Sequence, residues 1–276
     1  MPRKTKTPLV LVLLISTLII LYHRTFFWLV SEWLTNPYYS HGFLIPPISA
    51  FIAWLRRKEI VGVKVEEERI KSNGASLILG FGLLLLISGS LYGMNFIAAL
   101  SFIPVTIALL LHLCPNKMKA VLFPILFLFF AIPLPVERFG YLLQLFSARA
   151  SSFILHSFGL HVSRRGAQLS LKNSSFFVGE LCSGMQTLIS LLALAALFAY
   201  FMNCSPIKKL AIFFSGVPIA ILSNTFRICS IILAASFFGT NITMDFFHPA
   251  SSIILFLFAF AILLVIARLL RCEVMP

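Results

Sequence analysis

Residues 180–200 have the sequence ELCSGMQTLISLLALAALFAY, in which a short polar start leads into a long run of apolar side chains. Similar runs recur along the 276 residues, and 59% of the chain is hydrophobic while only 11% is charged. A soluble domain carries roughly a quarter of charged residues, so this composition excludes an ordinary soluble fold. Runs of about 20 apolar residues match the thickness of a bilayer. The sequence therefore predicts an all-α, polytopic transmembrane helix bundle.

The apolar runs predict about eight spans and leave no room for a separate soluble domain, so residues 1–276 are interpreted as a single transmembrane domain. The predicted helices cover 8–23, 40–55, 75–92, 94–114, 118–135, 182–202, 208–236 and 250–267. We expect the first to be a retained helix and not a cleaved signal peptide, because bulky aromatic residues follow it. The polar segment 137–181 predicts an interfacial amphipathic helix over 139–160, then short strands or a structured outer loop over 163–177.

The distribution of basic residues predicts how the chain is oriented in the membrane. The net charge is +13, and basic residues in membrane proteins concentrate in cytoplasmic loops. If the N-terminus is cytoplasmic, every short inner loop is basic and both termini lie inside. The positive charge is then explained by basic cytoplasmic loops and does not indicate nucleic-acid binding. We expect the protein to lie in a plasma membrane, with membrane lipids as partners.

This orientation brings reactive side chains from distant parts of the sequence to one membrane depth. Cys182 begins the sixth predicted helix from the outside, and His248 begins the eighth. Arg227 lies near the outer end of the seventh, at a rise of about 1.5 Å per residue. His41 lies in the outer turn between the first two helices. A thiol, a guanidinium group and two imidazoles are therefore expected at the outer face.

The cysteines divide into two groups. A cysteine in a membrane helix is usually a small apolar residue, and the chain shows neither a zinc-ligand spacing nor the pattern of a disulfide framework. This interpretation covers Cys114, Cys204, Cys229 and Cys272. Cys182 differs because Glu180 precedes it at a polar-to-apolar boundary, where a helix N-terminus would stabilise the thiolate.

The charged and imidazole side chains also have structural alternatives. Arg227 could extend to the lipid headgroups, but inside an apolar helix a charge costs several kcal/mol unless it is satisfied. Asn224 lies three residues earlier on the same helix face, so both side chains could serve one polar pocket. His248 precedes Pro249 as in a first helical turn, and either histidine could be structural.

Together these groups could form a site like that of a cysteine protease. A thiolate attacks a carbonyl, an imidazole transfers the proton, and a guanidinium stabilises the negative charge. HExxH and glycine-rich phosphate loops are absent from the sequence, so no metal or cofactor is predicted. Asp245 is the only aspartate, which argues against an intramembrane aspartyl protease. Two other classes stay open: a transporter lined by Arg227, Asn224 and His41, and a non-catalytic factor for exopolysaccharide or surface assembly.

Three sequence blocks resemble the exosortase/archaeosortase family of membrane cysteine transpeptidases, and in particular its bacterial exosortase branch. They are NPYYSHGFLIPPISAFIAW at 36–54, ELCSGMQTLISLLALAALFAY at 180–200, and PIAILSNTFRICSIIL at 218–233 followed by FFHPASS at 246–252. The resemblance implies that Cys182, Arg227 and His248 are the catalytic residues. Ser252 departs from the pattern, since the family often has glycine there.

The resemblance also implies a function and a set of partners. Such an enzyme cleaves C-terminal sorting signals of the PEP-CTERM type, which consist of a short motif, an apolar helix and a basic tail. It acts on secreted proteins at the outer face of the bacterial inner membrane and transfers them to a surface acceptor. Under this hypothesis, Arg164 and Arg165 in the outer loop bind the acidic residue of a Pro-Glu-Pro motif.

Overall fold

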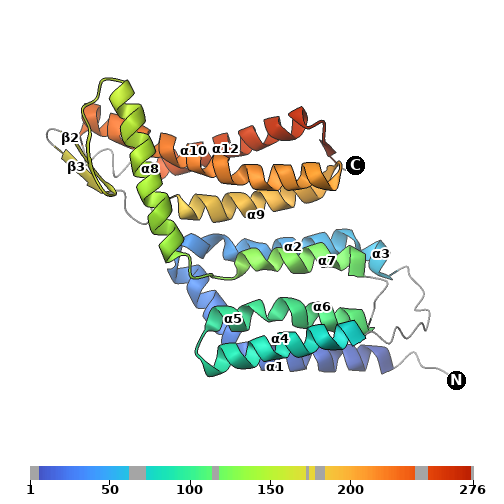
Figure 1. Ribbon diagram of the computed structural model, residues 1–276. Helices are drawn as coiled ribbons and strands as arrows, with labels where there is room; N and C mark the ends of the chain where they lie inside the picture. The colour runs from blue at the N-terminus through green and yellow to red at the C-terminus, as the bar shows by residue number, and fades with distance from the viewer. Residues whose placement is uncertain are drawn as a thin grey trace. The chain divides into compact units, whose positions relative to one another are not determined.

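A computed structural model describes residues 6–61, 73–113, 118–171, 174–177, 184–239 and 248–274 (Figure 1). The chain divides into two compact units, Met1–Leu134 and Pro135–Pro276. Helices dominate both units, so the predicted all-α membrane bundle is confirmed. The interpretation of residues 1–276 as one domain stays a prediction.

The first unit is built from helices throughout its described residues. They are α1 (Lys6–Thr35), η2 (Pro37–Leu44), α2 (Ile45–Leu55), α3 (Arg57–Val61), α4 (Asn73–Leu91), α5 (Asn95–Leu100), α6 (Phe102–Leu113), α7 (Met118–Phe127) and η4 (Leu128–Ala131). Helix α1 continues well beyond the predicted end at residue 23, because the aromatic residues that follow extend the apolar run. The predicted second helix is divided into η2 and α2, which begins with two prolines at positions that suit a helix start.

Within the described ranges, four helical stretches are long and apolar enough to cross a membrane: Leu13–Thr35, Gly74–Leu91, Asn95–His112 and Pro206–Phe238. Shorter apolar helices cover Met118–Ala131, Met185–Phe201 and Ile253–Leu269. Each of the eight predicted spans therefore corresponds to helical structure, although their lengths are unequal. Proline accounts for some of the difference, since Pro124 lies inside α7 and removes a backbone hydrogen bond there.

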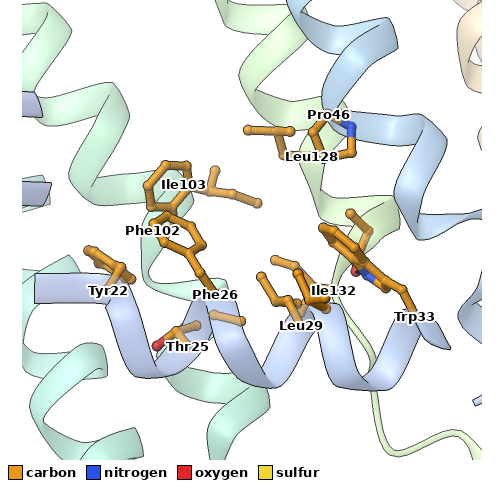
Figure 2. Close-up of a pocket in the computed structure, with 13 residues that line it drawn as sticks. Tyr22, Thr25, Phe26, Leu29, Trp33, Pro46, Phe102, Ile103, Leu128 and Ile132 are labelled. Carbon is orange, nitrogen blue, oxygen red and sulfur yellow. Dashed lines mark hydrogen bonds between the residues drawn. The ribbon is translucent and has the colours of Figure 1, made fainter. Parts of the chain in front are cut away.

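A cavity of about 490 Å³ lies inside the first unit and is lined almost wholly by apolar side chains. Figure 2 shows residues of α1 along one side and residues of α6 facing them. The lining consists of Tyr22, Thr25, Phe26, Leu29, Val30, Trp33, Pro46, Ala99, Phe102, Ile103, Leu128, Ala131 and Ile132. None of the site residues predicted from the sequence lines this cavity.

The second unit consists of a group of long helices, a crossing helix and two small sheets. Its elements are α8 (Glu137–Ser157), β1 (Ser163–Arg165), β2 (Gln168–Leu171), β3 (Ser174–Phe177), α9 (Met185–Phe201), β4 (Met202–Asn203), α10 (Pro206–Phe238), α12 (His248–Leu269) and β5 (Glu273–Val274). Helices α9, α10 and α12 lie side by side, and α8 runs across them (Figure 1). Leu191, Ile212 and Leu263 are fully buried between these three helices.

Helix α8 confirms the predicted helix, and its Arg149 is exposed as expected, but its uncharged polar side chains face the protein interior. Gln144, Ser147 and Ser151 are buried, whereas Phe146 and Phe153 are 56% and 75% exposed. An interfacial helix normally directs its polar face to water. Here the polar face packs against α10, because α10 carries polar side chains that supply hydrogen-bonding partners.

The predicted short strands are confirmed as an antiparallel sheet in the order β1-β2-β3. Ser163 pairs with Ser170 in the first ladder, and Gln168 pairs with Phe177 in the second. Leu169 of β2 is fully buried in a cluster that includes Ala148 of α8 and Ile232 of α10. This contact attaches the sheet to the helices near the residues described below.

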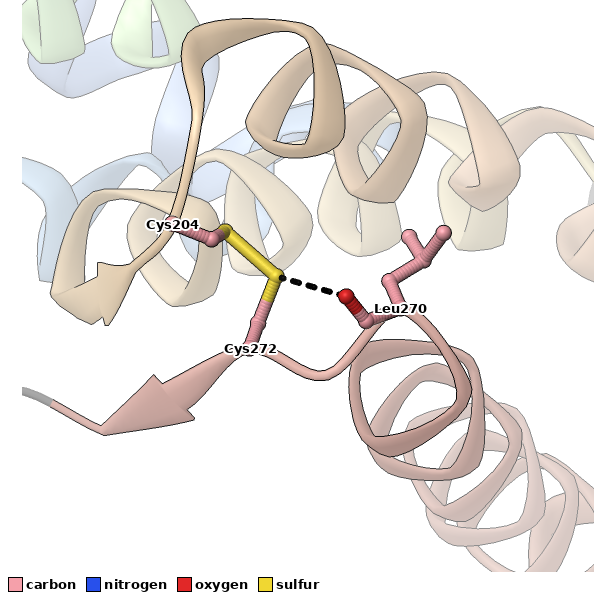
Figure 3. The surroundings of a disulfide bond; sticks show 3 residues. All are labelled: Cys204, Leu270 and Cys272. Atoms are coloured by element: carbon pink, nitrogen blue, oxygen red, sulfur yellow. Dashed lines mark hydrogen bonds between the residues drawn. A yellow bond between two sulfur atoms is a disulfide. The ribbon is translucent and has the colours of Figure 1, made fainter.

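Cys204 and Cys272 form a disulfide, which corrects their interpretation as unpaired apolar residues (Figure 3). Their Cα atoms are 5.2 Å apart, within the normal range for a disulfide. The bond joins the turn between α9 and α10 to the C-terminal strand, where β4 pairs with β5. Residues separated by 68 positions carry no local sequence signal of this pairing. In the predicted orientation this pair faces the cytoplasm, where thiols are normally kept reduced.

Candidate functional site

Helices α8 and α10 pack together and both carry buried polar side chains, and we name this set of side chains the polar seam. It consists of Gln144, Ser147 and Ser151 on α8 and Ser223, Asn224, Thr225 and Arg227 on α10. Each of these side chains is at most 6% exposed, although the two helices are otherwise rich in apolar residues. Buried polar groups are destabilising unless they are hydrogen-bonded, so the seam depends on contacts between the two helices.

Two serines of α8 form hydrogen bonds to α10 through their hydroxyl groups. The Asn224 side-chain amide donates from Nδ2 to Ser147 Oγ at 3.1 Å. One turn further along α8, Ser151 Oγ donates to the backbone carbonyl of Thr225 at 3.2 Å. The two serines are four residues apart, so they project from the same face of the helix. The first bond orients a side chain, whereas the second satisfies a backbone group.

The start of α9 packs directly against Asn224. Gly184 caps α9 with a φ of +83°, a conformation that L side chains rarely adopt. A Cβ atom at Gly184 would lie 2.6 Å from Cγ of Asn224, so only glycine allows this close approach. The Asn224 amide therefore lies between Ser147 on one helix and the first turn of another.

Arg227 shares the buried face of α10 with Asn224. Its side chain is 6% exposed, so it lies in the protein interior and not on the lipid-facing surface. The alternative in which Arg227 extends to the lipid headgroups does not fit this burial. Ser223, also on α10, is 1% exposed, and its Oγ has no hydrogen-bond partner among the residues that the structure describes. The seam thus holds a buried guanidinium group and, at Ser223, a buried hydroxyl with no partner among the described residues.

The predicted nucleophile, Cys182, and the nearby Glu180 are not among the residues that the structure describes. They lie two and four positions before Gly184 in the chain. His248 is the first residue of α12, as the sequence predicted, and only its backbone is described. The structure therefore brings Asn224 and Arg227 together, while the roles of Cys182 and His248 stay predictions.

His41 belongs to the first unit, where η2 holds it in a partly buried position. Burial lowers the pKa of the His41 imidazole, and a hydrogen bond to the backbone of Phe130 opposes this by raising the pKa. The ring stacks near Tyr39, with 6.2 Å between the centroids. Tyr39 in turn accepts a hydrogen bond from the backbone N–H of Leu134 at 3.0 Å. These contacts explain the burial of His41 as part of a packed turn. Its supporting role in catalysis stays a prediction.

Arg164 and Arg165 lie on the exposed strand β1. Arg164 Nη1 donates a hydrogen bond to the backbone carbonyl of Gly166 at 3.0 Å, within the turn that joins β1 to β2. Both side chains remain accessible at the surface of the second unit. Their predicted role in substrate binding is not tested by these contacts.

The sequence analysis missed Ser147, Ser151 and Gln144 as possible site residues. A signal was present, because these residues are spaced three and four apart and so form one stripe on a helix. The stripe was interpreted as a water-facing surface, since periodicity alone does not show what the polar face contacts. Among the described residues there is no group of three side chains suited to hold a metal ion.

Comparison with known proteins identifies one related family. The model of the transmembrane exosortase family matches residues 33–265, and this region contains every site residue predicted above. No curated protein and no solved structure matches the chain.

Proposed function

Because the chain belongs to the transmembrane exosortase family, whose members are membrane cysteine transpeptidases that act on secreted proteins, we propose that it processes C-terminal sorting signals. The substrate is a secreted protein that ends in a short motif of the PEP-CTERM type, an apolar helix and a basic tail. The enzyme cleaves near the motif at the outer face of the bacterial plasma membrane. It then transfers the new acyl end to a surface acceptor.

The observation that carries this proposal is the contact of Gly184 with Asn224 in the polar seam. Two residues of extended chain span at most about 7 Å. A cysteine two positions before Gly184 is therefore tied to the end of α9 that packs on the seam. Arg227 is buried three residues after Asn224 on the same face of α10. This arrangement supports a site in which a thiol and a guanidinium group act on one substrate carbonyl.

The proposed reaction proceeds through a thioester. The Cys182 thiolate attacks the substrate carbonyl carbon, and Arg227 stabilises the negative charge that develops on the oxygen. The C–N bond then breaks as His248 donates a proton to the leaving amine. His248 next accepts a proton from the acceptor nucleophile, which attacks the thioester and releases the thiolate. The acceptor's proton therefore restores the imidazolium, and the enzyme is unchanged.

The substrate geometry is consistent with the charges of the enzyme. A basic tail is favoured on the cytoplasmic side, so the apolar helix of the signal would cross the membrane with its motif at the outer interface. Arg164 and Arg165 are exposed on β1 and could pair there with the glutamate of a Pro-Glu-Pro motif. Such exposed pairs contribute more to recognition than to affinity.

The test is processing of a co-expressed, tagged secreted protein that carries such a signal. Cys182→Ala removes the nucleophile, so we expect processing to be abolished while the protein still accumulates in the membrane. Cys229→Ala is the matched control, because Cys229 is a free cysteine of α10 with no assigned role. Normal processing by Cys182→Ala would refute the proposal.

A labelling experiment separately tests the proposed orientation. A membrane-impermeant maleimide applied to intact cells should modify Cys182 and should reduce processing. After treatment of the intact cells with a membrane-impermeant reductant, Cys204 and Cys272 should remain unlabelled, and they should react once the cells are permeabilised and the disulfide is reduced. Labelling of Cys204 or Cys272 from outside would reverse the assigned topology.

A further inference from the structure

Gln144, Ser147 and Ser151 form one buried stripe on α8, whereas the exposed side of the helix carries large aromatic side chains together with Arg138 and Arg149. Gln144, Ser147 and Ser151 are 5%, 0% and 0% exposed, and Phe139 on the opposite face is 67% exposed. A serine hydroxyl contributes little packing, so two fully buried serines on one stripe are not explained by filling space. What each hydroxyl contacts on α10 distinguishes their roles.

The hydrogen bond of Ser151 to the backbone of α10 is sufficient to explain its burial by a structural role. Its hydroxyl donates to the backbone carbonyl of Thr225, and its own backbone carbonyl lies 3.8 Å from the Cys229 sulfur. A backbone carbonyl keeps its position when a neighbouring side chain changes, because the helix holds it. Loss of the Ser151 hydroxyl should therefore affect stability and leave the orientation of side chains in the seam unchanged.

Ser147 has a different kind of partner, because its hydroxyl accepts from the Asn224 side chain. An asparagine amide has two orientations that differ by a half-turn, and hydrogen bonds select between them. With Nδ2 directed to Ser147, the carbonyl oxygen of the amide lies on the other side of the group. The same amide lies in close contact with Gly184 at the start of α9.

We propose that Ser147 is a positioning residue of the transpeptidase site, which holds the Asn224 amide in one orientation against Gly184, two positions after Cys182 in the chain. This inference rests on the proposed function, since it assumes that Cys182 is the nucleophile. Ser147 does not touch the substrate in this scheme. It acts through Asn224, which in turn limits where the first turn of α9 and the residues before it can lie.

The first test compares Ser147→Ala with Ser151→Ala in detergent-solubilised enzyme. Each variant loses one buried hydrogen bond, so both should lose a similar amount of thermal stability. Ser147→Ala should lower kcat for the tagged sorting-signal protein by about tenfold to a hundredfold with little change in KM, since a displacement of about 1 Å at a reacting group has an effect of this size. Ser151→Ala should keep kcat within about twofold. Equal kcat values for the two variants would overturn the inference.

The second test asks whether Ser147 acts through Asn224. In the Asn224→Ala background, Ser147→Ala should cause no further loss of kcat, because the side chain that it positions is already absent. A further tenfold loss in the double variant would show that Ser147 acts by another route and would overturn the inference. If Ser147→Ala does not accumulate, Ser147→Cys replaces it, because its volume is similar and sulfur is a weaker acceptor.

The outcome of these tests can be separated from the outcome for the proposed function. If Cys182→Ala processes the substrate normally, the transpeptidase proposal fails. If Cys182→Ala is inactive and Ser147→Ala behaves like Ser151→Ala, only the role of Ser147 fails. The rate of iodoacetamide alkylation of Cys182, measured without substrate, gives an independent readout. It should change severalfold in Ser147→Ala and remain unchanged in Ser151→Ala.

Discussion

The two units of this protein bury polar side chains in different ways. In the first unit, Tyr22 and Ser101 share a hydrogen bond of 2.8 Å, and Ser101 also donates to the carbonyl of Ala98. Ser49 donates to the backbone carbonyl of Pro124. These polar groups lie apart from one another, and each forms hydrogen bonds with one or two nearby groups. In the described part of the second unit, buried polar side chains are concentrated on α8 and α10, and one of them is an arginine.

This difference separates structural polar groups from a candidate site. A hydroxyl that bonds to a nearby carbonyl is nearly neutral in its effect on an apolar core. A buried arginine surrounded by polar side chains on two helices is costly, and membrane proteins retain such groups mainly where they have a function. The first unit also contains the apolar cavity, which has no charged lining residue (Figure 2). We therefore expect changes in the first unit to affect stability, and changes at Ser147, Asn224 and Arg227 of the polar seam to affect activity.

The largest expected effect is that of Arg227→Leu. Removal of a group that stabilises the oxyanion typically lowers kcat by about a hundredfold to a thousandfold. Stability should change little, since replacing a buried ion by a hydrophobic residue is often neutral. Processing of the tagged substrate and the melting temperature in detergent give the two readouts. Arg149→Leu, on an exposed position of α8, is the control and should keep normal activity. A kcat of Arg227→Leu within tenfold of the wild type would contradict the assignment.

An intermediate effect is expected for Gly184→Ala, in comparison with Gly159→Ala. Both glycines have a φ near +83°, so both alanines incur a similar backbone strain of about 1 kcal/mol. The added Cβ meets Asn224 only at Gly184, because nothing lies within 4 Å of that position at Gly159. Gly184→Ala should therefore lower kcat by at least about tenfold, whereas Gly159→Ala should lower only the melting temperature. Similar kcat values for the two variants would show that backbone strain, and not the contact with Asn224, determines the effect of Gly184→Ala.

The smallest effect is expected for Tyr22→Phe in the first unit. The substitution removes the hydroxyl that bonds to Ser101 and keeps the aromatic ring that packs against Phe102. The free energy of unfolding should fall by about 1 kcal/mol, because hydrogen bonds inside membrane proteins contribute on this scale. Processing should remain within twofold of the wild type. A large loss of activity at normal stability would break the distinction between the two units.

Part of the candidate site was predictable, because the energetic cost of a charged residue inside an apolar helix can be recognised from the sequence alone. Arg227 is conspicuous in an apolar helix, and Asn224 follows from helical spacing. Ser147 was not predictable in the same way, since serine occurs on both buried and exposed faces of membrane helices. The Cys204–Cys272 pair was missed because nothing in the local sequence joins residues 68 positions apart.

Hydropathy established the class of fold, because the length of an apolar run and the cost of burying a charge are local properties of the chain. Basic residues likewise predicted an orientation without any contact being known. The direction of the polar face of α8 was decided by the tertiary structure alone. An amphipathic pattern shows that the two faces of a helix differ in polarity. In a membrane protein, however, either water or another helix can supply hydrogen-bonding partners for the polar face. Only the packing of α8 on α10 shows that Ser147 faces Asn224 and that Ser151 faces the backbone carbonyl of Thr225.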